Sequence, residues 1–196
     1  MNFKTINLAI FASGNGSNAE NIVQYFANNH IVKVKLILTN NPKAGVIERM
    51  KKYNLAVTVF NKVEFYSMDL IVDLLRQSSI DYIILAGFLW LIPETIIDAY
   101  ENKILNIHPA LLPAYGGKGM YGHYVHQKVV ENNETKTGIT IHIVNKEYDR
   151  GKILFQAICP VYQYDTAESV ANKVHCLEYQ YFPQVILSYI YSHALI

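Results

Sequence analysis

The sequence has little of several features that would assign a protein to a special class. Its 196 residues include two cysteines, which are too few for a disulfide framework and lack the spacing of metal ligands. We therefore expect no metal site, and expect Cys159 and Cys176 to be ordinary buried thiols. No apolar run approaches the roughly 18 residues that span a bilayer. A net charge of +1 provides no broad basic surface for a polyanion. We expect a cytoplasmic protein with neither nucleic acid nor membrane as a partner.

The residues that are present indicate a globular α/β domain. The chain is 51% hydrophobic and 17% charged, and its length suits one domain with a sizeable core. In the first half, short apolar runs alternate with amphipathic stretches of helical period. Such strands predict a mostly parallel sheet with helices on both faces. The expected strands are Ile6–Ala12, Val32–Thr39, Ala56–Phe60 and Tyr82–Ala86, and the expected helices are Asn18–Asn28, Ala44–Tyr53 and Glu64–Gln77.

The second half predicts a different arrangement after one more helix and parallel strand. A loop with four glycines, Leu111–Gly122, precedes two long β-type runs that a short turn joins, which favours an antiparallel pair. Asp165 and Glu168 have the spacing of a capping box and predict the start of a long last helix. The expected elements are helix Pro93–Tyr100, strand Lys103–His108, helix His123–Asn132, strands Gly138–Val144 and Ile153–Val161, and helix Thr166–Ser192.

A glycine turn, Ser13–Asn18, joins the first strand to the first helix. Glycines let backbone amides approach a ligand, and a helix N-terminus favours an anion, so the turn is a candidate phosphate site. The turn also fits the dinucleotide-binding pattern, but Leu38–Lys43 lacks the acid that would hold a ribose. A nicotinamide cofactor is therefore disfavoured, while a tight turn without any ligand remains an alternative.

The strand end Leu105–Pro109 carries the most informative polar groups. Asn106 and His108 are two residues apart, so they point to the same face about 6.6 Å apart, at the edge where open α/β sheets bind ligands. An amide beside an imidazole can stabilise an oxyanion and move a proton, as acyl transfer to an amine requires. Asp149, on the turn between the last two strands, could orient His108, accept a proton from an attacking amine, or serve only the turn. We interpret His142 as structural or solvent-exposed.

These segments together resemble the glycinamide ribonucleotide formyltransferases of purine biosynthesis. The matching segments keep that family's order and approximate spacing over nearly the whole chain. They are Ser13–Asn18, Leu85–Phe88, Leu105–Pro113, Thr137–Gly138, Ile141–Val144, Asp149 and Gly151. The resemblance implies the formyltransferase fold, with a nucleotide-binding half at 1–100 and a catalytic, folate-binding half at 101–196 of a single domain.

The resemblance also implies the chemistry and its catalytic residues. The amine of glycinamide ribonucleotide would attack the formyl carbon of 10-formyltetrahydrofolate, which is a co-substrate rather than a tightly bound cofactor. Asn106 and protonated His108 would stabilise the tetrahedral oxyanion, and Asp149 would position His108 and, with water, help to move protons. The products would be the formylated nucleotide and tetrahydrofolate. The resemblance leaves open whether the enzyme is a monomer or a homodimer.

The binding residues follow from the same resemblance. The nucleotide would be held by the phosphate turn, by an acid on the last helix, and by a lysine where many members carry arginine; these are Gly14, Asn15, Gly16, Ser17, Asn18, Glu178 and Lys62. The folate would lie against an apolar wall and the turn before Asp149; these are Phe88, Leu89, Trp90, Leu91, Ile92, Val144, Asn145 and Asp149. His126 matches a family histidine near the site, without an assigned role.

Related functions remain as alternatives. Methionyl-tRNA formyltransferase and formyltetrahydrofolate hydrolase resemble this domain, but their additional domains have no counterpart in these 196 residues. A sugar-nucleotide formyltransferase is disfavoured by the Ser13–Asn18 turn. A non-catalytic nucleotide- or folate-binding protein would not need Asn106, His108 and Asp149 together.

Overall fold

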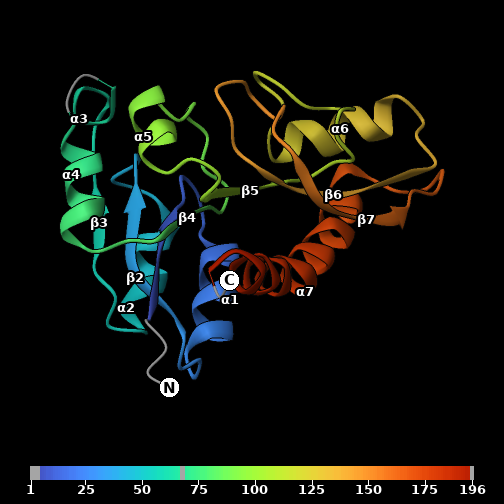
Figure 1. The fold of residues 1–196 in the computed structure, drawn as a ribbon. Coiled ribbons are helices and arrows are strands. Elements are labelled where there is room, and N and C mark those ends of the chain that lie inside the picture. The colour runs from blue at the N-terminus through green and yellow to red at the C-terminus, as the bar shows by residue number, and fades with distance from the viewer. Residues whose placement is uncertain (1–4, 67–68, 195–196) are drawn as a thin grey trace. The chain divides into compact units, whose positions relative to one another are not determined.

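The computed structural model describes residues 5–66 and 69–194, and over these residues the chain forms seven strands and seven helices (Figure 1). The strands are β1 (Ile6–Phe11), β2 (Val32–Thr39), β3 (Val57–Val59), β4 (Tyr82–Leu85), β5 (Ile104–His108), β6 (Lys136–Ile143) and β7 (Ile153–Pro160). The helices are α1 (Ser17–Phe26), α2 (Gly45–Lys51), α3 (Lys62–Tyr66), α4 (Leu70–Gln77), α5 (Glu94–Ala99), α6 (His123–Glu131) and α7 (Ala167–Ala194). The chain comprises two compact units, Met1–Leu105 and Asn106–Ile196.

The strand order confirms the expected fold class. Hydrogen bonding orders the strands β3-β2-β1-β4-β5-β6-β7. The pairs β1–β2, β2–β3 and β1–β4 are parallel, whereas β6 and β7 are antiparallel. The predicted α/β fold, with a mostly parallel sheet, an antiparallel C-terminal pair and a long C-terminal helix, is therefore correct. In the part of the chain that the structure describes, no helix combines the length and apolarity needed to cross a bilayer.

Helices cover both faces of the strands in the first unit. The chain moves outward from β1 to β2 to β3 and then crosses back to β4. Since such crossovers are right-handed, the outward steps place α1 and α2 on one face, and the return step places α4 on the other. In Figure 1, α1 and α4 lie on opposite sides of these strands. β4 is buried along its whole length between the two layers.

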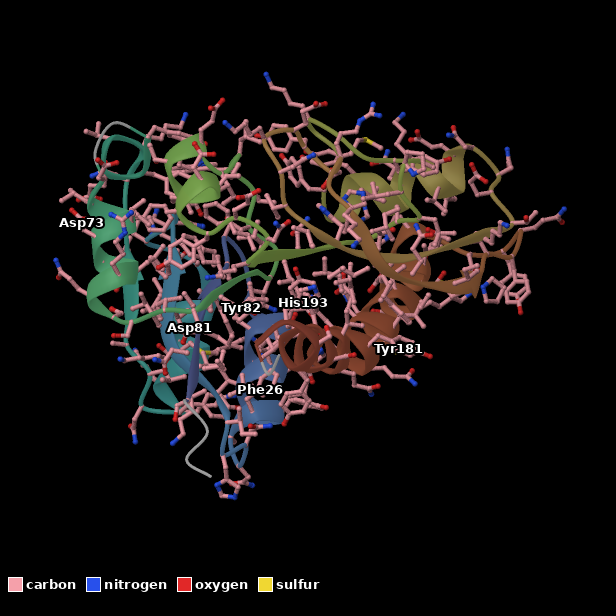
Figure 2. The ribbon with its side chains drawn as sticks, viewed as in Figure 1. Phe26, Asp73, Asp81, Tyr82, Tyr181 and His193 are labelled. Atoms are coloured by element: carbon pink, nitrogen blue, oxygen red, sulfur yellow. The ribbon has the colours of Figure 1, made fainter. Side chains whose placement is uncertain are left out.

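Asp81 fixes the start of β4 against β1. One oxygen of its carboxylate accepts a hydrogen bond of 2.9 Å from the backbone N–H of Asn7, and its own N–H donates to the Asn7 carbonyl at 2.8 Å. Tyr82, labelled in Figure 2, follows as the first residue of the strand. Its side chain is 5% exposed. The pairing sets the register in which Leu8 lies opposite Tyr82 and Phe11 opposite Leu85, so both strands end at the same edge.

The predicted helix Glu64–Gln77 is wrong in its start and its continuity. The structure has α3 from Lys62 to Tyr66 and a separate α4 from Leu70, and residues 67 and 68 lie outside the described residues. The earlier start has a clear cause in a capping box. The Asn61 side chain accepts hydrogen bonds from the N–H groups of Val63 and Glu64, and the Glu64 carboxylate accepts one of 2.7 Å from the Asn61 N–H.

The cap of α7 lies one residue later than predicted. Thr166 and Ser169 cap reciprocally, each side-chain oxygen accepting the other's backbone N–H at 2.9 and 3.2 Å. Asp165 instead accepts from the Tyr162 N–H and pairs with Lys173. Along the same helix Cys176 is exposed, so the expectation that both cysteines are buried holds only for Cys159.

The core of the second unit lies where α7 packs against β6 and α6. β6 is buried at every residue from Thr137 to Ile143, which shows that both of its faces are covered. The fully buried apolar side chains of this unit include Ile139, Ile141, Val170, Val174, Phe182 and Ile186. The pairing of β6 with β7 shifts register between Ile141 and His142, which marks a β-bulge.

Candidate active site

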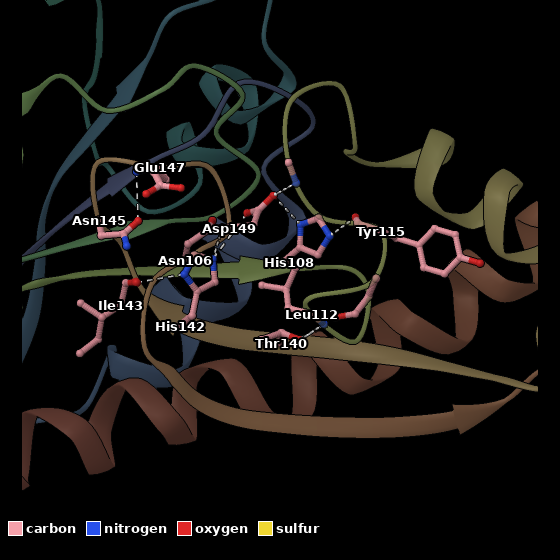
Figure 3. A network of polar contacts seen from close by, with 12 residues as sticks. Asn106, His108, Leu112, Tyr115, Thr140, His142, Ile143, Asn145, Glu147 and Asp149 are labelled. Carbon is pink, nitrogen blue, oxygen red and sulfur yellow. Dashed lines mark hydrogen bonds and ion pairs between the residues drawn. The ribbon is translucent and has the colours of Figure 1, made fainter.

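A polar network lies at the carboxyl end of β5 and includes the three residues expected to be catalytic (Figure 3). Asn106 and His108 come from β5, His142 comes from the neighbouring β6, and Asp149 comes from the turn between β6 and β7. All four belong to the second unit. The structure thus brings the predicted trio together and adds His142.

His108 is held by a backbone carbonyl. Its Nε2 atom lies 2.7 Å from the carbonyl oxygen of Tyr115, and the side chain is almost completely buried. A carbonyl can only accept, so the hydrogen must be on Nε2 in the neutral ring. Nδ1 is therefore the nitrogen that gains or loses a proton. It faces Oδ2 of Asp149 at 3.6 Å, which is too long for a direct hydrogen bond.

Burial lowers the pKa of His108 below its ordinary value of 6.5. The Asp149 carboxylate and the Tyr115 carbonyl oppose this effect, and His142 adds slightly to it. Desolvation dominates because the charged ring loses more hydration than the single nearby carboxylate restores. The ring is consequently mainly neutral at pH 7 before substrate binds.

Asp149 is a carboxylate fixed between two imidazoles. Its Oδ2 accepts a hydrogen bond of 2.9 Å from the N–H of Gly117, and its Oδ1 lies 3.6 Å from Nε2 of His142. Burial by itself raises the pKa of Asp149, but His142, His108 and the Gly117 amide outweigh it and the net shift is downward. Asp149 also has a φ of 54°, which is uncommon for a residue with a side chain. The group is thus a persistent negative charge in a constrained position.

His142 is buried against Asn106, so of the two interpretations given for it the solvent-exposed one is wrong. Its ring is 2% exposed, and Nδ1 lies 3.0 Å from the carbonyl oxygen of Ile143, to which it must donate. In the neutral ring Nε2 is then an acceptor, and it lies 3.0 Å from Nδ2 of Asn106. The amide therefore presents its nitrogen to His142, and its second N–H is directed elsewhere.

Gly151 is required by the backbone geometry beside this network. A Cβ atom at residue 151 would lie 1.6 Å from the carbonyl oxygen of Ile143 and 3.4 Å from Nδ1 of His142. Any larger residue would push the β7 side of the turn away from β6. The glycine two residues after Asp149 thus keeps the turn close enough to bring the carboxylate to the histidines.

The glycine turn of the first unit has the features of an anion site. Gly16 has a φ of 78°, and its amide precedes α1 without any side-chain cap on the helix N-terminus. A Cβ at Gly16 would lie 2.5 Å from Cβ of Val46, so the turn packs directly on α2. Gly14 has no atom within 4 Å of such a Cβ and faces open space. Asn15 is exposed, and Ser17 and Asn18 begin the helix half-buried.

Arg49 supports this turn from α2, a role that the sequence did not indicate. Its Nε donates to the Asn15 carbonyl at 2.8 Å, and Nη1 pairs with the Glu20 carboxylate in α1. Tyr53 and Lys52 bind the same carboxylate. Burial raises the pKa of Glu20, but these three partners lower it further than burial raises it. Arg49 therefore ties the turn to both helices.

The apolar wall expected for folate belongs partly to the core. Phe88 and Ile92 are buried, and Phe88 packs with Phe11, Phe60 and Phe65. Leu89 is 44% exposed, whereas Trp90 and Leu91 are half-buried. Lys62, expected near the phosphate, is exposed and has its Nζ 5.9 Å from the centre of the Trp90 ring.

The remaining candidates lie in the second unit. Val144 and Asn145 are half-buried in the turn after β6, where the Asn145 side chain accepts from the N–H of Glu147 (Figure 3). Glu178 is 5% exposed on α7. His126 on α6 is 2% exposed, its Nδ1 lacks a hydrogen-bond partner, and burial together with neighbouring histidines lowers its pKa to about 4. Among the described residues, no three His, Cys, Asp or Glu side chains are grouped to hold a metal.

An amide donor, a neutral imidazole and a fixed carboxylate on one edge of an α/β sheet are the groups that acyl transfer uses. Residues 6–186 match the family model described as formyl transferase. The chain belongs to the formyl transferase family, and the resemblance inferred from its motifs is confirmed.

Individual relatives within this family are named phosphoribosylglycinamide formyltransferase. The chain is 40% identical over 185 residues to the chloroplastic phosphoribosylglycinamide formyltransferase of Arabidopsis thaliana, covering 91% of this chain and 63% of that protein. It is 36% identical to phosphoribosylglycinamide formyltransferase of Bacillus subtilis, covering 91% of each. The crystal structure of phosphoribosylglycinamide formyltransferase from Bacillus halodurans superposes with a TM-score of 0.84 at 34% identity, covering 96% of each chain. The chain thus spans less than two thirds of the plant relative and nearly all of the bacterial ones.

Proposed function

We propose that this chain transfers the formyl group of 10-formyltetrahydrofolate to the amine of glycinamide ribonucleotide, in purine biosynthesis. The products are formylglycinamide ribonucleotide and tetrahydrofolate. The observation that carries the proposal is the Asn106–His108–Asp149 network in a member of the formyl transferase family. The similar proteins are named phosphoribosylglycinamide formyltransferase, which supports the amine of that nucleotide as the acceptor. The enzyme acts in the cytoplasm, as a monomer or a homodimer.

The first step of the proposed reaction forms a bond between the nucleotide amine and the formyl carbon. The carbonyl electrons move to oxygen, and the second N–H of Asn106 stabilises the resulting oxyanion. Nδ1 of neutral His108 takes the proton that the amine loses. The imidazolium that forms lies beside the Asp149 carboxylate, which stabilises it at 3.6 Å. His108 therefore becomes charged during the reaction, when the negative oxyanion is present.

The second step breaks the bond between the formyl carbon and N10 of the folate. The oxyanion electrons return to form the carbonyl, and the proton held by His108 passes to N10, directly or through water. His108 is then neutral again and ready for the next cycle. Atoms and charge balance over the two steps without a metal or a redox partner, because the formyl group and one proton exchange carriers.

Substrate binding is assigned to the other candidates. The glycine turn Gly14–Asn18 and the N-terminus of α1 bind the nucleotide phosphate, supported by the Arg49 contact with the Asn15 carbonyl. Leu89, Trp90 and the turn at Val144–Asn145 are assigned to the folate, with Phe88 and Ile92 forming the core behind them. Glu178 is assigned to the nucleotide, and Lys62 to an anionic group of either substrate.

The test is an acceptor series with purified enzyme. Loss of 10-formyltetrahydrofolate is followed spectroscopically with glycinamide ribonucleotide, with an amino sugar nucleotide, and with no acceptor. We expect turnover only with glycinamide ribonucleotide, with one formylated nucleotide formed per folate consumed. Turnover with the amino sugar nucleotide would instead assign a sugar-nucleotide formyltransferase. Turnover without an acceptor would assign a hydrolase.

A further inference from the structure

The carbonyl that holds His108 belongs to a residue that is itself anchored at its side chain. The hydroxyl of Tyr115 donates to the Glu134 carboxylate at 2.6 Å and accepts from the Asn132 side chain at 2.8 Å. Both partners lie in the turn between α6 and β6. Tyr115 therefore connects this turn to His108 through one side chain and one backbone carbonyl.

We infer that Tyr115 is a positioning residue for His108, and the inference rests on the proposed function. The hydroxyl contacts with Asn132 and Glu134 hold the Tyr115 carbonyl 2.7 Å from Nε2 of His108. That carbonyl keeps the imidazole hydrogen on Nε2 and leaves Nδ1 as the nitrogen that accepts the proton. Tyr115 touches no reacting atom in this scheme and acts only through His108.

The backbone of Tyr115 explains why a side-chain anchor is needed. Its φ is 55°, in the left-handed region that residues with a side chain rarely adopt. An isolated tyrosine in a loop would leave this conformation and turn its carbonyl away from His108. The two hydrogen bonds at the hydroxyl oppose that change, because the ring cannot swing without breaking both. The anchor thus supports the strained backbone at the one carbonyl that contacts His108.

The other groups around His108 do not replace this contact. Asp149 from the β6–β7 turn faces Nδ1, while His142 from β6 slightly disfavours the charged ring. Among the described residues, the hydrogen-bond partner of Nε2 is the Tyr115 carbonyl. Loss of the carbonyl contact would let the hydrogen move to Nδ1, where it would block proton uptake from the amine.

The test compares Tyr115→Phe with Tyr121→Phe. Tyr115→Phe keeps the ring and removes both hydroxyl contacts, whereas Tyr121 is a half-exposed tyrosine of the same loop that packs on Tyr124. We expect kcat to fall about 10-fold in Tyr115→Phe. This corresponds to a loss of transition-state stabilisation about equal to the net energy of one hydrogen bond. The KM values for both substrates should change less than about twofold. Tyr121→Phe should retain the parental kcat.

Two further measurements separate positioning from a general structural effect. In a double-mutant cycle, Glu134→Ala should lower kcat in the parent but not in Tyr115→Phe, since the contact is already lost there. Nitrogen NMR of His108 should show hydrogen on Nε2 in the parent and a mixture of tautomers in Tyr115→Phe. Because the NMR reading needs no turnover, it tests the anchor even if the parent fails the formyl-transfer assay.

The inference is overturned if Tyr115→Phe keeps the parental kcat and the single Nε2–H tautomer. It is also overturned if the loss of kcat is matched by Tyr121→Phe, or if Glu134→Ala has the same effect in both backgrounds. Urea denaturation of each variant shows whether the fold is retained. If Tyr115→Phe does not fold, Glu134→Gln, which keeps an acceptor for the hydroxyl, should retain activity where Glu134→Ala does not.

Discussion

Nδ2 of Asn106 lies 3.0 Å from Nε2 of His142, and the carbonyl of Ile143 fixes the opposite side of the same ring. This relationship determines which end of the Asn106 amide is available to a substrate. An oxyanion needs an N–H group, and the amide could present its oxygen if it rotated by half a turn. His142 prevents that rotation only while its Nε2 is an acceptor.

The first prediction concerns His142. His142→Ala should lower kcat roughly 10- to 100-fold. This decrease is no larger than the one expected when the oxyanion donor itself is removed. His142→Gln should retain more activity, because its side-chain oxygen can accept the same Asn106 N–H. Steady-state kinetics of both variants measure the difference. Equal activity of the alanine and parental enzymes would show that Asn106 needs no such orientation.

The second prediction concerns pH. His108 must be neutral to accept the amine proton, and burial lowers its pKa below 6.5. The rate should therefore be constant above pH 6.5 and fall only as the pH drops through the lowered pKa. Asp149→Asn removes the charge that opposes the lowering, so the acid limb should move to still lower pH and the plateau should fall. The pH profile of kcat/KM reports these values for the free enzyme. A rate that instead falls as pH rises through 6.5 would mean that a protonated resting His108 is required.

The third prediction separates two glycines of the same turn. Gly16→Ala places a Cβ against Val46 at a φ of 78°, so it should lower the free energy of unfolding by about 1–3 kcal/mol and raise the KM for the nucleotide. Gly14→Ala meets no atom within 4 Å and should change stability by less than about 0.5 kcal/mol. Urea denaturation compares the two. Similar losses in both variants would contradict the packing of Gly16 on α2.

The fourth prediction concerns stability in acid. His126 has a folded pKa of about 4, against an ordinary value of 6.5, so its neutral form is favoured by folding. The resulting stability is present above pH 6.5 and is lost as the pH falls toward 4. As the pH falls from 7 to 5, this histidine should lower the free energy of unfolding by about 1–2 kcal/mol. His126→Phe should lose that part of the pH dependence, while the exposed His30→Ala should keep it. An unchanged pH dependence in His126→Phe would contradict the burial of a neutral ring.

The strands and most helices could be predicted from the sequence because their buried residues recur with the regular period of a strand or a helix. β2 matches its predicted range Val32–Thr39, and β1, β4 and β5 differ by a residue at an end. The helix predicted at Glu64–Gln77 was wrong because apolar residues recur with helical spacing in both α3 and α4. The spacing alone does not show that these are two helices. The capping box at Asn61 and Glu64 was a local signal that the hydrophobic pattern obscured.

The candidate site could be predicted only in part. Asn106 and His108 are two residues apart on one strand, so their proximity follows from the period of a strand. His142 could not be assigned because it comes from the neighbouring strand β6, and its contact with Asn106 depends on how β5 and β6 pair. Arg49 was missed because its role depends on a backbone carbonyl, and no sequence motif marks such an acceptor.

The most direct test of the central claim is a single-turnover measurement with His108→Ala. Enzyme in excess is mixed with 10-formyltetrahydrofolate and glycinamide ribonucleotide, and formation of the formylated nucleotide is followed for the parent and the variant. We predict fast, stoichiometric formyl transfer in the parent and a rate at least about 100-fold lower in His108→Ala, with nucleotide binding retained. Parental transfer that continues at nearly the same rate in His108→Ala would contradict the assignment of His108 as the group that takes the amine proton.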